Sequence, residues 1–218
     1  MPPRPSTRPR RSYDQYCAAA RALDAVGDRW TLLIVRELLA GPRRYTDLHA
    51  DLPGVSTDVL ASRLKDMEQS GLATRRRLPP PASAYVYELT GRGRELLPVL
   101  RALAAWGAPE LAERRPTDAV RAHWFALPLR AHLESLDWQG VVEVRLDEGD
   151  FHVRVGGDDE VVFGEGPAPV EPDARMSLDA VTAVELGRGV LAVADGVRAG
   201  RITVTGEGAS AKALREGT

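Results

Sequence analysis

The segment that decides the fold runs from Pro53 to Leu89 and reads PGVSTDVLASRLKDMEQSGLATRRRLPPPASAYVYEL. Pro53-Gly54 forces a turn, Ser56 is placed to cap a helix, and Gly71 ends that helix. Helical spacing predicts a buried apolar stripe made of Val59, Leu60, Leu64 and Met67. The opposite face has only small or polar residues, namely Thr57, Asp58, Ala61, Ser62 and Lys65. A helix with such a face can lie close against another surface.

Two strands are predicted after this helix, at residues 72–77 and 84–89, joined by Pro79-Pro80-Pro81. The first strand carries Arg75, Arg76 and Arg77, which repel one another unless an anion lies across them. Because side chains alternate along a strand, Arg75 and Arg77 share one side and Arg76 lies on the other. We therefore expect Arg75 and Arg77 to face an anionic partner.

Three shorter helices are predicted upstream, at residues 17–27, 30–40 and 45–52. The third is followed by a tight turn and the longer helix that begins at Ser56, which is the order of a helix-turn-helix. With the basic ribbon after it, the layout is that of a winged helix-turn-helix. In that layout one helix enters the major groove of DNA, and the wing contacts phosphates.

The predicted DNA contacts come from the helix that begins at Ser56, from the wing and from two arginines before that helix. Arg63 has two interpretations that we leave open, a phosphate contact or a buried pair with an acid such as Glu68. The full predicted set is Arg43, Arg44, Ser56, Thr57, Asp58, Ala61, Ser62, Arg63, Lys65, Arg75, Arg77 and Tyr85.

The charge of the chain is unevenly distributed. Its net charge is −2 over 218 residues. Residues 1–116, however, carry about 19 basic and 13 acidic side chains, and the remainder about 10 and 18. A basic half that meets a polyanion and an acidic half held away from it would explain this division.

Composition excludes several classes of protein. No apolar run approaches about 20 residues, and the Arg/Pro-rich N-terminus has no apolar core, so we expect a cytoplasmic protein without a membrane span. The single cysteine, Cys17, cannot form an internal disulfide or a thiolate zinc cluster. The histidines have no metal-ligand spacing, and no phosphate loop or nucleophile elbow is present. The sequence thus predicts no metal, no cofactor and no enzyme.

A helix predicted from Thr90 to Gly107 carries a broad apolar stripe that includes Trp106. We expect a second subunit to cover it and to form a homodimer; packing against the second domain is the alternative. Pro98 should bend this helix or fix its start.

The C-terminal half has a different pattern, and its predicted class is α+β with an antiparallel sheet covered by helices. The predicted domains are a disordered tail (1–16), a DNA-binding and dimerisation domain (17–107), a linker (108–117) and a ligand-binding domain (118–218). In the last domain helices are predicted at 118–136, 178–186 and 190–198, with a short final helix that buries Ala211 and Leu214. Strands are predicted at 141–146, 151–155, 160–163, 174–178 and 201–205.

Residues 17–107 resemble the HxlR-type branch of the MarR-like winged-helix regulators. The matching motifs include Trp30-Thr31-Leu32-Leu33-Ile34, Arg36-Glu37-Leu38, Gly41-Pro42-Arg43-Arg44-Tyr45, Leu52-Pro53-Gly54-Val55-Ser56, Tyr87-Glu88-Leu89-Thr90 and Trp106-Gly107. The resemblance implies a homodimeric bacterial transcription factor whose two wings straddle a palindromic operator. Cys17 lies where some members carry a redox-sensing thiol and where non-sensing members also have a cysteine, so both a structural and a sensing role stay open.

Residues 118–218 resemble the sterol-carrier-protein fold, through Pro172-Asp173-Ala174, Leu186-Gly187-Arg188-Gly189, Gly200-Arg201-Ile202 and Val204-Thr205-Gly206. That fold implies an apolar cavity for a lipophilic molecule. The residues expected to line it, each of which could equally be core, are Trp124, Phe125, Trp138, Phe163, Leu186 and Leu191.

The sequence therefore predicts a DNA-binding transcription regulator, a repressor that binds a palindromic operator as a homodimer and responds to a hydrophobic effector. Three alternatives remain: a thiol-based redox regulator acting through Cys17, a lipid carrier and a non-specific nucleoid protein.

Overall fold

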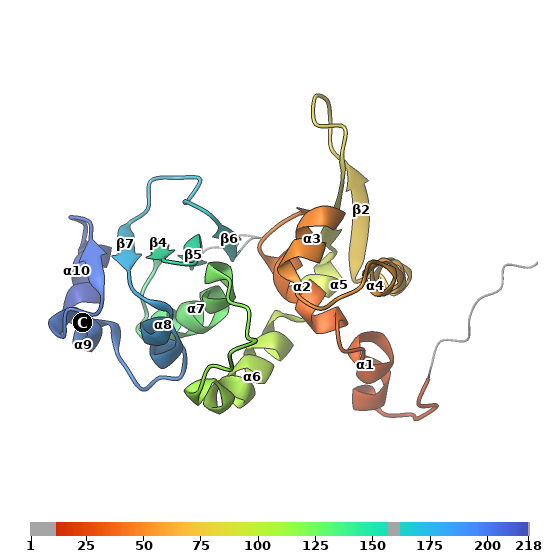
Figure 1. Ribbon diagram of the computed structural model, residues 1–218, viewed down its shortest axis with the longest axis horizontal. Helices are drawn as coiled ribbons and strands as arrows, with labels where there is room; N and C mark the ends of the chain where they lie inside the picture. Colours follow the sequence, from red (N-terminus) through yellow and green to blue (C-terminus); the bar gives the residue numbers. More distant parts are fainter. Residues whose placement is uncertain (1–11, 157–161, 218) are drawn as a thin grey trace, which may run out of the picture.

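The computed structural model describes residues 12–156 and 162–217, which form two halves side by side (Figure 1). Residues 1–11 of the predicted tail lie outside the described part, whereas Ser12 and Tyr13 hydrogen-bond to Asp24 of the first helix. The elements of the N-terminal half are α1 (Ala18–Val26), α2 (Thr31–Leu39), β1 (Arg43–Arg44), α3 (Tyr45–Asp51), α4 (Thr57–Gln69), β2 (Ala73–Arg77), β3 (Tyr85–Leu89), α5 (Gly91–Arg94) and α6 (Leu97–Gly107).

Helix α4 forms as its caps predict. The Ser56 hydroxyl accepts a hydrogen bond from the Val59 amide at 3.3 Å, and Gly71 takes a left-handed φ of 68° just beyond the helix. Leu60, Leu64 and Met67 form the buried stripe. Val59 was wrongly expected in this stripe: it is 38% exposed, because the 100° turn from Leu60 carries it onto the outer face.

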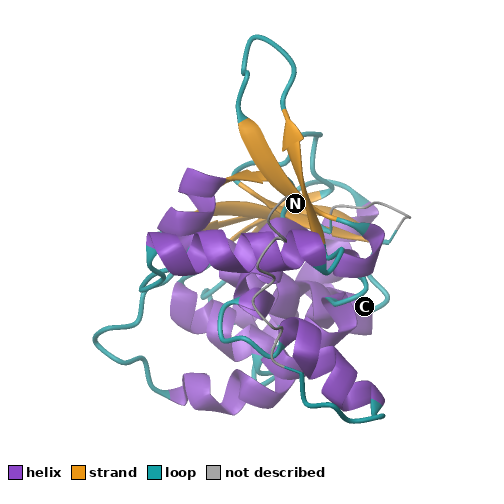
Figure 2. Ribbon diagram, turned by 90° about the vertical axis from the view of Figure 1, so that its right-hand side faces the viewer, coloured by secondary structure: helices purple, strands orange, loops and turns teal. Residues whose placement is uncertain are grey.

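The wing is the antiparallel hairpin of β2 and β3, with Arg75 opposite Tyr87 and Arg77 opposite Tyr85. Its connecting loop projects beyond the rest of the molecule (Figure 2). The two-residue strand β1 pairs with β3 on the other side, so the sheet order is β1-β3-β2.

The segment from Thr90 to Gly107 is two helices instead of the predicted one. Thr90 caps α5 by accepting a hydrogen bond from the Gly93 amide. Pro98 lies in the first turn of α6, where a backbone N–H would have no partner within the helix. Its ring would clash with a further turn of helix before it, so α6 cannot extend upstream. Of the two expectations for Pro98, that it bends the helix or that it fixes the start of the helix, the second is confirmed.

The C-terminal half contains one mixed sheet with the order β6-β5-β4-β7-β8. Its helices lie on one side of the sheet (Figure 1). The elements after α6 are the 3-10 helices η1 (Ala108–Ala112) and η2 (Ala122–Phe125), α7 (Ala126–Ser135), β4 (Gly140–Leu146), β5 (Gly149–Val155), β6 (Phe163–Glu165), β7 (Ala174–Ser177), α8 (Ala180–Gly187), α9 (Val193–Arg198), β8 (Thr203–Thr205) and α10 (Ala209–Glu216).

Several details of this half differ from the prediction. The sheet is not purely antiparallel, because the loop after β6 carries the chain back across the sheet and β7 enters parallel to β4. The helix predicted at 118–136 begins only at residue 122 and is divided into η2 and α7, since residues 115–118 form a hydrogen-bonded turn. Of the strand predicted at 160–163, residues 160 and 161 lie outside the described part, and β6 starts at Phe163. The predicted linker begins with η1.

The space between the sheet and its helices is filled by side chains. Val142, Val144, Phe151 and Val153 alternate inward and are essentially inaccessible to solvent. The outward positions between them are polar, among them Glu143 and Arg145. The sheet therefore buries one face and leaves the other to water.

Candidate nucleic-acid interface

Helix α4 lies on the side of the N-terminal half that is remote from the C-terminal half (Figure 1). Of the residues predicted to contact bases, Ser56, Thr57, Asp58, Ala61 and Lys65 are exposed, and Ser62 is half-buried. The Tyr45 hydroxyl of α3 donates to the Thr57 carbonyl at 2.8 Å. This bond ties the first turn of α4 to α3 and fixes the end of the helix that would enter a groove.

The wing separates its three arginines as the alternation predicted. The Arg75 guanidinium stacks over the Tyr85 ring at 4.0 Å, and Arg77 is exposed near the loop. On the other side, Arg76 pairs with Glu88 at 3.1 Å. The mutual repulsion of the three is thus partly relieved by an acid of the same hairpin. Within the described residues, Arg75 and Arg77 form no ion pair, so their charges face solvent.

Two arginines from the predicted DNA set are engaged elsewhere. Arg63 pairs with Asp66 at 2.9 Å and with Asp28 at 3.3 Å, so its acidic partners are these and not Glu68. Arg43 was expected to contact DNA, but it pairs with Glu165 of β6 at 2.5 Å, and its side chain is only 13% exposed. Arg44 is exposed beside it, because side chains alternate along β1.

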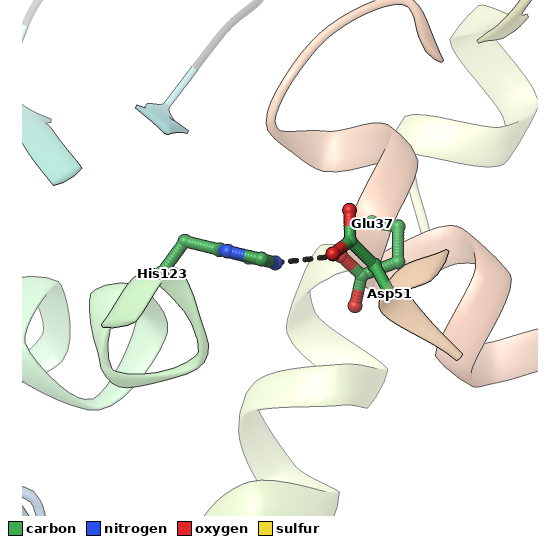
Figure 3. Close-up of side chains that lie close together, drawn as sticks. All are labelled: Glu37, Asp51 and His123. Atoms are coloured by element: carbon green, nitrogen blue, oxygen red, sulfur yellow. Dashed lines mark hydrogen bonds and ion pairs between the residues drawn. The ribbon is translucent and has the colours of Figure 1, made fainter. Parts of the chain in front are cut away.

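Behind the DNA-facing elements lies a polar cluster that joins the two halves, which we call the joint. At its centre the buried carboxylate of Glu37 on α2 meets His123 of η2, with 2.7 Å between Oε2 and Nε2 (Figure 3). The other oxygen, Oε1, accepts the Trp124 indole N–H at 3.0 Å and the Arg36 guanidinium at 2.6 Å. The joint consists of Arg36, Glu37, Arg43, Asp51, Arg121, His123, Trp124 and Glu165.

The protonation of the joint follows from its contacts. Burial alone would raise the pKa of Glu37, but the hydrogen bond from His123 and the charge of Arg36 outweigh it and lower that pKa. An ionised carboxylate only accepts, so the hydrogen between Glu37 and His123 belongs to Nε2 of the imidazole. Asp51 shows the opposite shift: burial, followed by the charge of Glu37, raises its pKa.

The joint brings together residue types that can bind a metal ion. Ligand atoms of Glu37, Asp51 and His123 lie within 4.8 Å of one another, so the scattered histidines of the sequence do include one placed beside two carboxylates. The same carboxylates already face arginines, however: Glu37 faces Arg36, and Asp51 faces Arg121 at 3.4 Å. Three acids and three arginines balance within the joint, which favours an ion-pair network over a cation site.

Sequence reasoning missed the joint, although α2 contained a signal. Glu37 lies between Ile34 and Leu38 on the apolar stripe of α2, where a charge must find a partner when the helix packs. That partner is 86 residues away in the chain, and periodicity gives no information on such a distance.

Comparison with known proteins agrees with the geometry of the N-terminal half. A model of the HxlR-like helix-turn-helix family matches residues 25–115. The HTH-type transcriptional regulator YodB of Bacillus subtilis is 35% identical over 99 residues, which cover 45% of this chain and 86% of YodB. The uncharacterized regulator YvaP of the same organism is 37% identical over 86 residues, 39% of this chain and 80% of YvaP. The chain belongs to the HxlR-like helix-turn-helix family.

This HxlR-like protein is accordingly a DNA-binding transcriptional regulator with MarR-like structural neighbours. One solved structure, the reduced form of YodB from B. subtilis, is 32% identical, covers 48% of this chain and all of its own, and has a TM-score of 0.40. These relatives are named as transcriptional regulators, not enzymes. The family match ends at residue 115, so His123, Trp124 and Glu165 of the joint lie beyond it.

Cys17 of this HxlR-like protein is exposed at the N-terminus of α1. The backbone N–H groups of Ala20 and then Ala19 interact with its sulfur and lower the pKa of the thiol, although neither makes a full capping hydrogen bond. The thiol is therefore accessible and more easily deprotonated than an ordinary cysteine.

The residues expected to line one apolar cavity do not come together. Phe163 and Leu186 are packed in the core, and Leu191 packs against it. Trp124 belongs to the joint, with Arg36 stacked on its ring at 4.3 Å, and Phe125 follows it at the end of η2. Of the set, Trp138 lines a cavity of about 380 Å³. That cavity lies between residues 136–139 and α10, and its other lining residues include Ala213 and Leu214.

A second hollow of about 440 Å³ lies between the two halves, lined by Arg43, Asp47, His152 and Glu165 among others. It is polar and open, unlike the apolar cavity that the C-terminal resemblance implied. Among the described residues, no helix is long and apolar enough to cross a membrane.

Proposed function

We propose that this regulator is a homodimeric repressor that binds a palindromic operator and that an apolar small molecule in its C-terminal half weakens operator binding. Residues 17–107 would form the DNA-binding and dimerisation unit and residues 118–218 the sensing unit of a cytoplasmic protein. The observation that carries the proposal is the separation of two surfaces in the N-terminal half: a polar face on α4 and the wing, and an apolar face on α1 and α6.

The first surface supports DNA binding in a defined register. The short side chains of Thr57, Ala61 and Ser62 allow α4 to approach base edges closely, and hydroxyl groups can bond to either purines or pyrimidines. Arg75 and Arg77 are exposed on the wing and would contact phosphates beside the groove. A helix in the major groove beside a basic wing is the arrangement that reads one half-site.

The second surface supports a dimer. Trp106 is 81% exposed, and Val99, Leu103 and Leu111 are large apolar residues exposed near it. Leu23 of α1 is also exposed. Exposed large apolar side chains along one helix are typical of an interaction site, and a second copy would place two recognition helices about one helical turn apart on DNA.

An effector site is supported by the cavity beside Trp138. It combines apolar wall atoms from Ala213 and Leu214 with polar groups, and its volume lies within the range of small-ligand sites. Trp138 itself is fixed by a hydrogen bond from its indole N–H to the Ser210 carbonyl. The coupling would reach DNA only if the ligand prefers one of two conformations.

A gel-shift titration at several salt concentrations tests the proposal. We expect the full chain to prefer an inverted repeat over a single half-site and over random duplex, with log affinity falling by roughly 0.9 per phosphate contact for each decade of salt. Equal affinity for all three duplexes would favour the non-specific nucleoid alternative. Apolar metabolites added to the same titration test the effector: we expect 5- to 150-fold weaker binding.

A second candidate function, thiol-based redox regulation, is favoured by the exposed and activated Cys17. A sole cysteine can form a disulfide only with another subunit or with a small thiol. In the main proposal, diamide or hydrogen peroxide changes operator binding little. A loss of binding on oxidation that is absent in Cys17→Ser would replace effector sensing with redox sensing.

A further inference from the structure

We propose that His123 and Trp124 are positioning residues for DNA recognition: through Glu37 they hold α2, and with it α3 and α4, in the orientation that reads a specific sequence. The proposal rests on the DNA-binding function of the chain and is independent of any effector. Neither residue lies on the DNA-facing side, so both act through the N-terminal half.

The joint attaches the C-terminal half to three separate elements of the DNA-binding unit. His123 and Trp124 bind Glu37 of α2. Arg121 donates to the Asp51 carboxylate at 3.4 Å and to the Ala50 carbonyl at 3.2 Å, both at the end of α3. Glu165 binds Arg43 of β1. Contacts on three elements fix an orientation, whereas contact on one element would leave a pivot.

Each attached element lies directly behind a DNA-facing one. Asp51 is the last residue of α3, and only the turn from Leu52 to Ser56 separates it from α4. Tyr45, at the other end of α3, holds the first turn of α4 through the Thr57 carbonyl. β1 pairs with β3 of the wing, with Arg43 opposite Tyr87. A small rotation of α2, β1 and α3 would therefore move both the recognition helix and the wing.

The chemistry of the joint favours one fixed orientation of the two halves over a contact along which they could slide. Glu37 is 0% exposed and His123 is 2% exposed, so a shift that breaks their bond leaves Oε2 of the carboxylate and Nε2 of the ring unpaired where water does not reach them. The groups facing this pair are Arg36 from α2, Asp51 from α3, Arg43 from β1, Arg121 and Trp124 from the segment of η2, and Glu165 from β6. Hydrogen bonds are directional, and so this network specifies one arrangement where apolar packing would tolerate several.

The test uses the full chain and two duplexes of equal length: one that the wild-type protein selects from a random pool, and a scrambled version of it. His123→Leu removes the donor to Glu37 and keeps an apolar filling. His123→Gln retains an N–H donor. His132→Leu is the matched control, because His132 is half-buried on α7 and its Nε2 has no hydrogen-bond partner among the described residues.

We expect His123→Leu to weaken binding of the selected duplex at least tenfold while affinity for the scrambled duplex changes less than twofold. His123→Gln and His132→Leu should stay within threefold of the wild type on both duplexes. A merely structural role predicts parallel losses on both duplexes that follow the melting temperature, and this result would overturn the proposal, as would an unchanged affinity ratio in folded His123→Leu.

Trp124→Phe provides the same test if His123→Leu does not fold, since it removes only the indole N–H and keeps a ring for Arg36. We expect at least a threefold fall in the ratio of selected to scrambled affinity, and an unchanged ratio contradicts the proposal. Failure of the palindrome or of the effector would appear in the wild-type protein itself, so it is distinguishable from failure of the joint.

Discussion

The wing of the N-terminal half and the outer face of the C-terminal sheet differ in whether their arginines have acidic partners. On the wing, Arg75 and Arg77 have no acidic partner among the described residues, and their charges are left to solvent. On the outer face of the C-terminal sheet, Arg145 pairs with Asp150 at 3.3 Å, and Arg175 pairs with Glu143 and Glu171. A surface that neutralises itself gains little from a polyanion, whereas an unneutralised one releases counterions when it binds DNA.

This difference is a better guide to function than net charge. The −8 of the C-terminal half and the +6 of the N-terminal half are only rough sums, and Arg76 is a basic residue of the wing that its own hairpin already neutralises. The joint is a third case, in which charges of the two halves neutralise one another around the buried pair of Glu37 and His123.

The largest expected effect comes from breaking the joint, because it makes the two halves one unit. Glu37→Ala should lower the free energy of unfolding by about 3–5 kcal/mol, since it leaves buried His123 and Arg36 without their acceptor. Denaturant unfolding measures this loss. A loss below about 1 kcal/mol would mean that water reaches the joint and replaces the carboxylate.

The pH dependence of the joint should be the next largest effect. Glu37 has a lowered pKa in the folded protein, so the stability it contributes is present above its ordinary pKa and is lost as the pH falls through the folded value. Glu37→Gln should therefore cost about 1.5–3 kcal/mol near pH 7, and this cost should shrink as the pH falls below the ordinary carboxyl pKa and through the lowered folded value.

Unfolding curves of both proteins across this range check the prediction. Asp51 has the opposite sign, because its pKa is raised and its contribution is lost as the pH rises. The informative quantity is thus the difference between wild type and Glu37→Gln. A difference that stays constant with pH would show that the charge of Glu37 is not stabilised in the folded state.

Trp106→Glu tests whether the apolar face of α6 belongs to a dimer. A charge on this exposed residue should leave the monomer fold intact and weaken association by about 2 kcal/mol, the lower bound for a central interface residue. Sedimentation equilibrium measures the change. If the variant associates as the wild type does, the face has another partner.

The smallest expected effect sharpens the comparison of the two arginine surfaces. Arg77→Ala should weaken binding to every duplex by about 1 kcal/mol and reduce the salt slope by about one unit. Arg145→Ala on the C-terminal sheet, its matched control, should change neither. Equal effects of the two substitutions would mean that both halves contact DNA.

Local signals made much of the N-terminal half predictable. Ser56 and Gly71 cap α4, Pro98 fixes the start of α6, and alternation separates Arg76 from Arg75 and Arg77. Each of these depends on residues a few positions apart. The same reasoning failed where a distant contact decides: Arg43 turns toward Glu165, and Trp124 binds Glu37 instead of lining a cavity.

The topology of the C-terminal half was predictable only in part, for the same reason. Alternation found the strands, but the parallel pairing of β7 with β4 depends on the path of the loop after β6. Large apolar residues such as Phe163 and Leu186 are common both in ligand sites and in protein cores. In the structure both are buried in the core.

The central claim is that the N-terminal half reads DNA while the C-terminal half acts on it from behind. Amide hydrogen exchange of the full chain, with and without the selected duplex, tests it most directly. The account predicts that DNA slows exchange most strongly in α4 and in the β2–β3 wing and leaves strands β5 and β8 of the C-terminal sheet unchanged. Protection on those strands, or none on α4 and the wing, would contradict it.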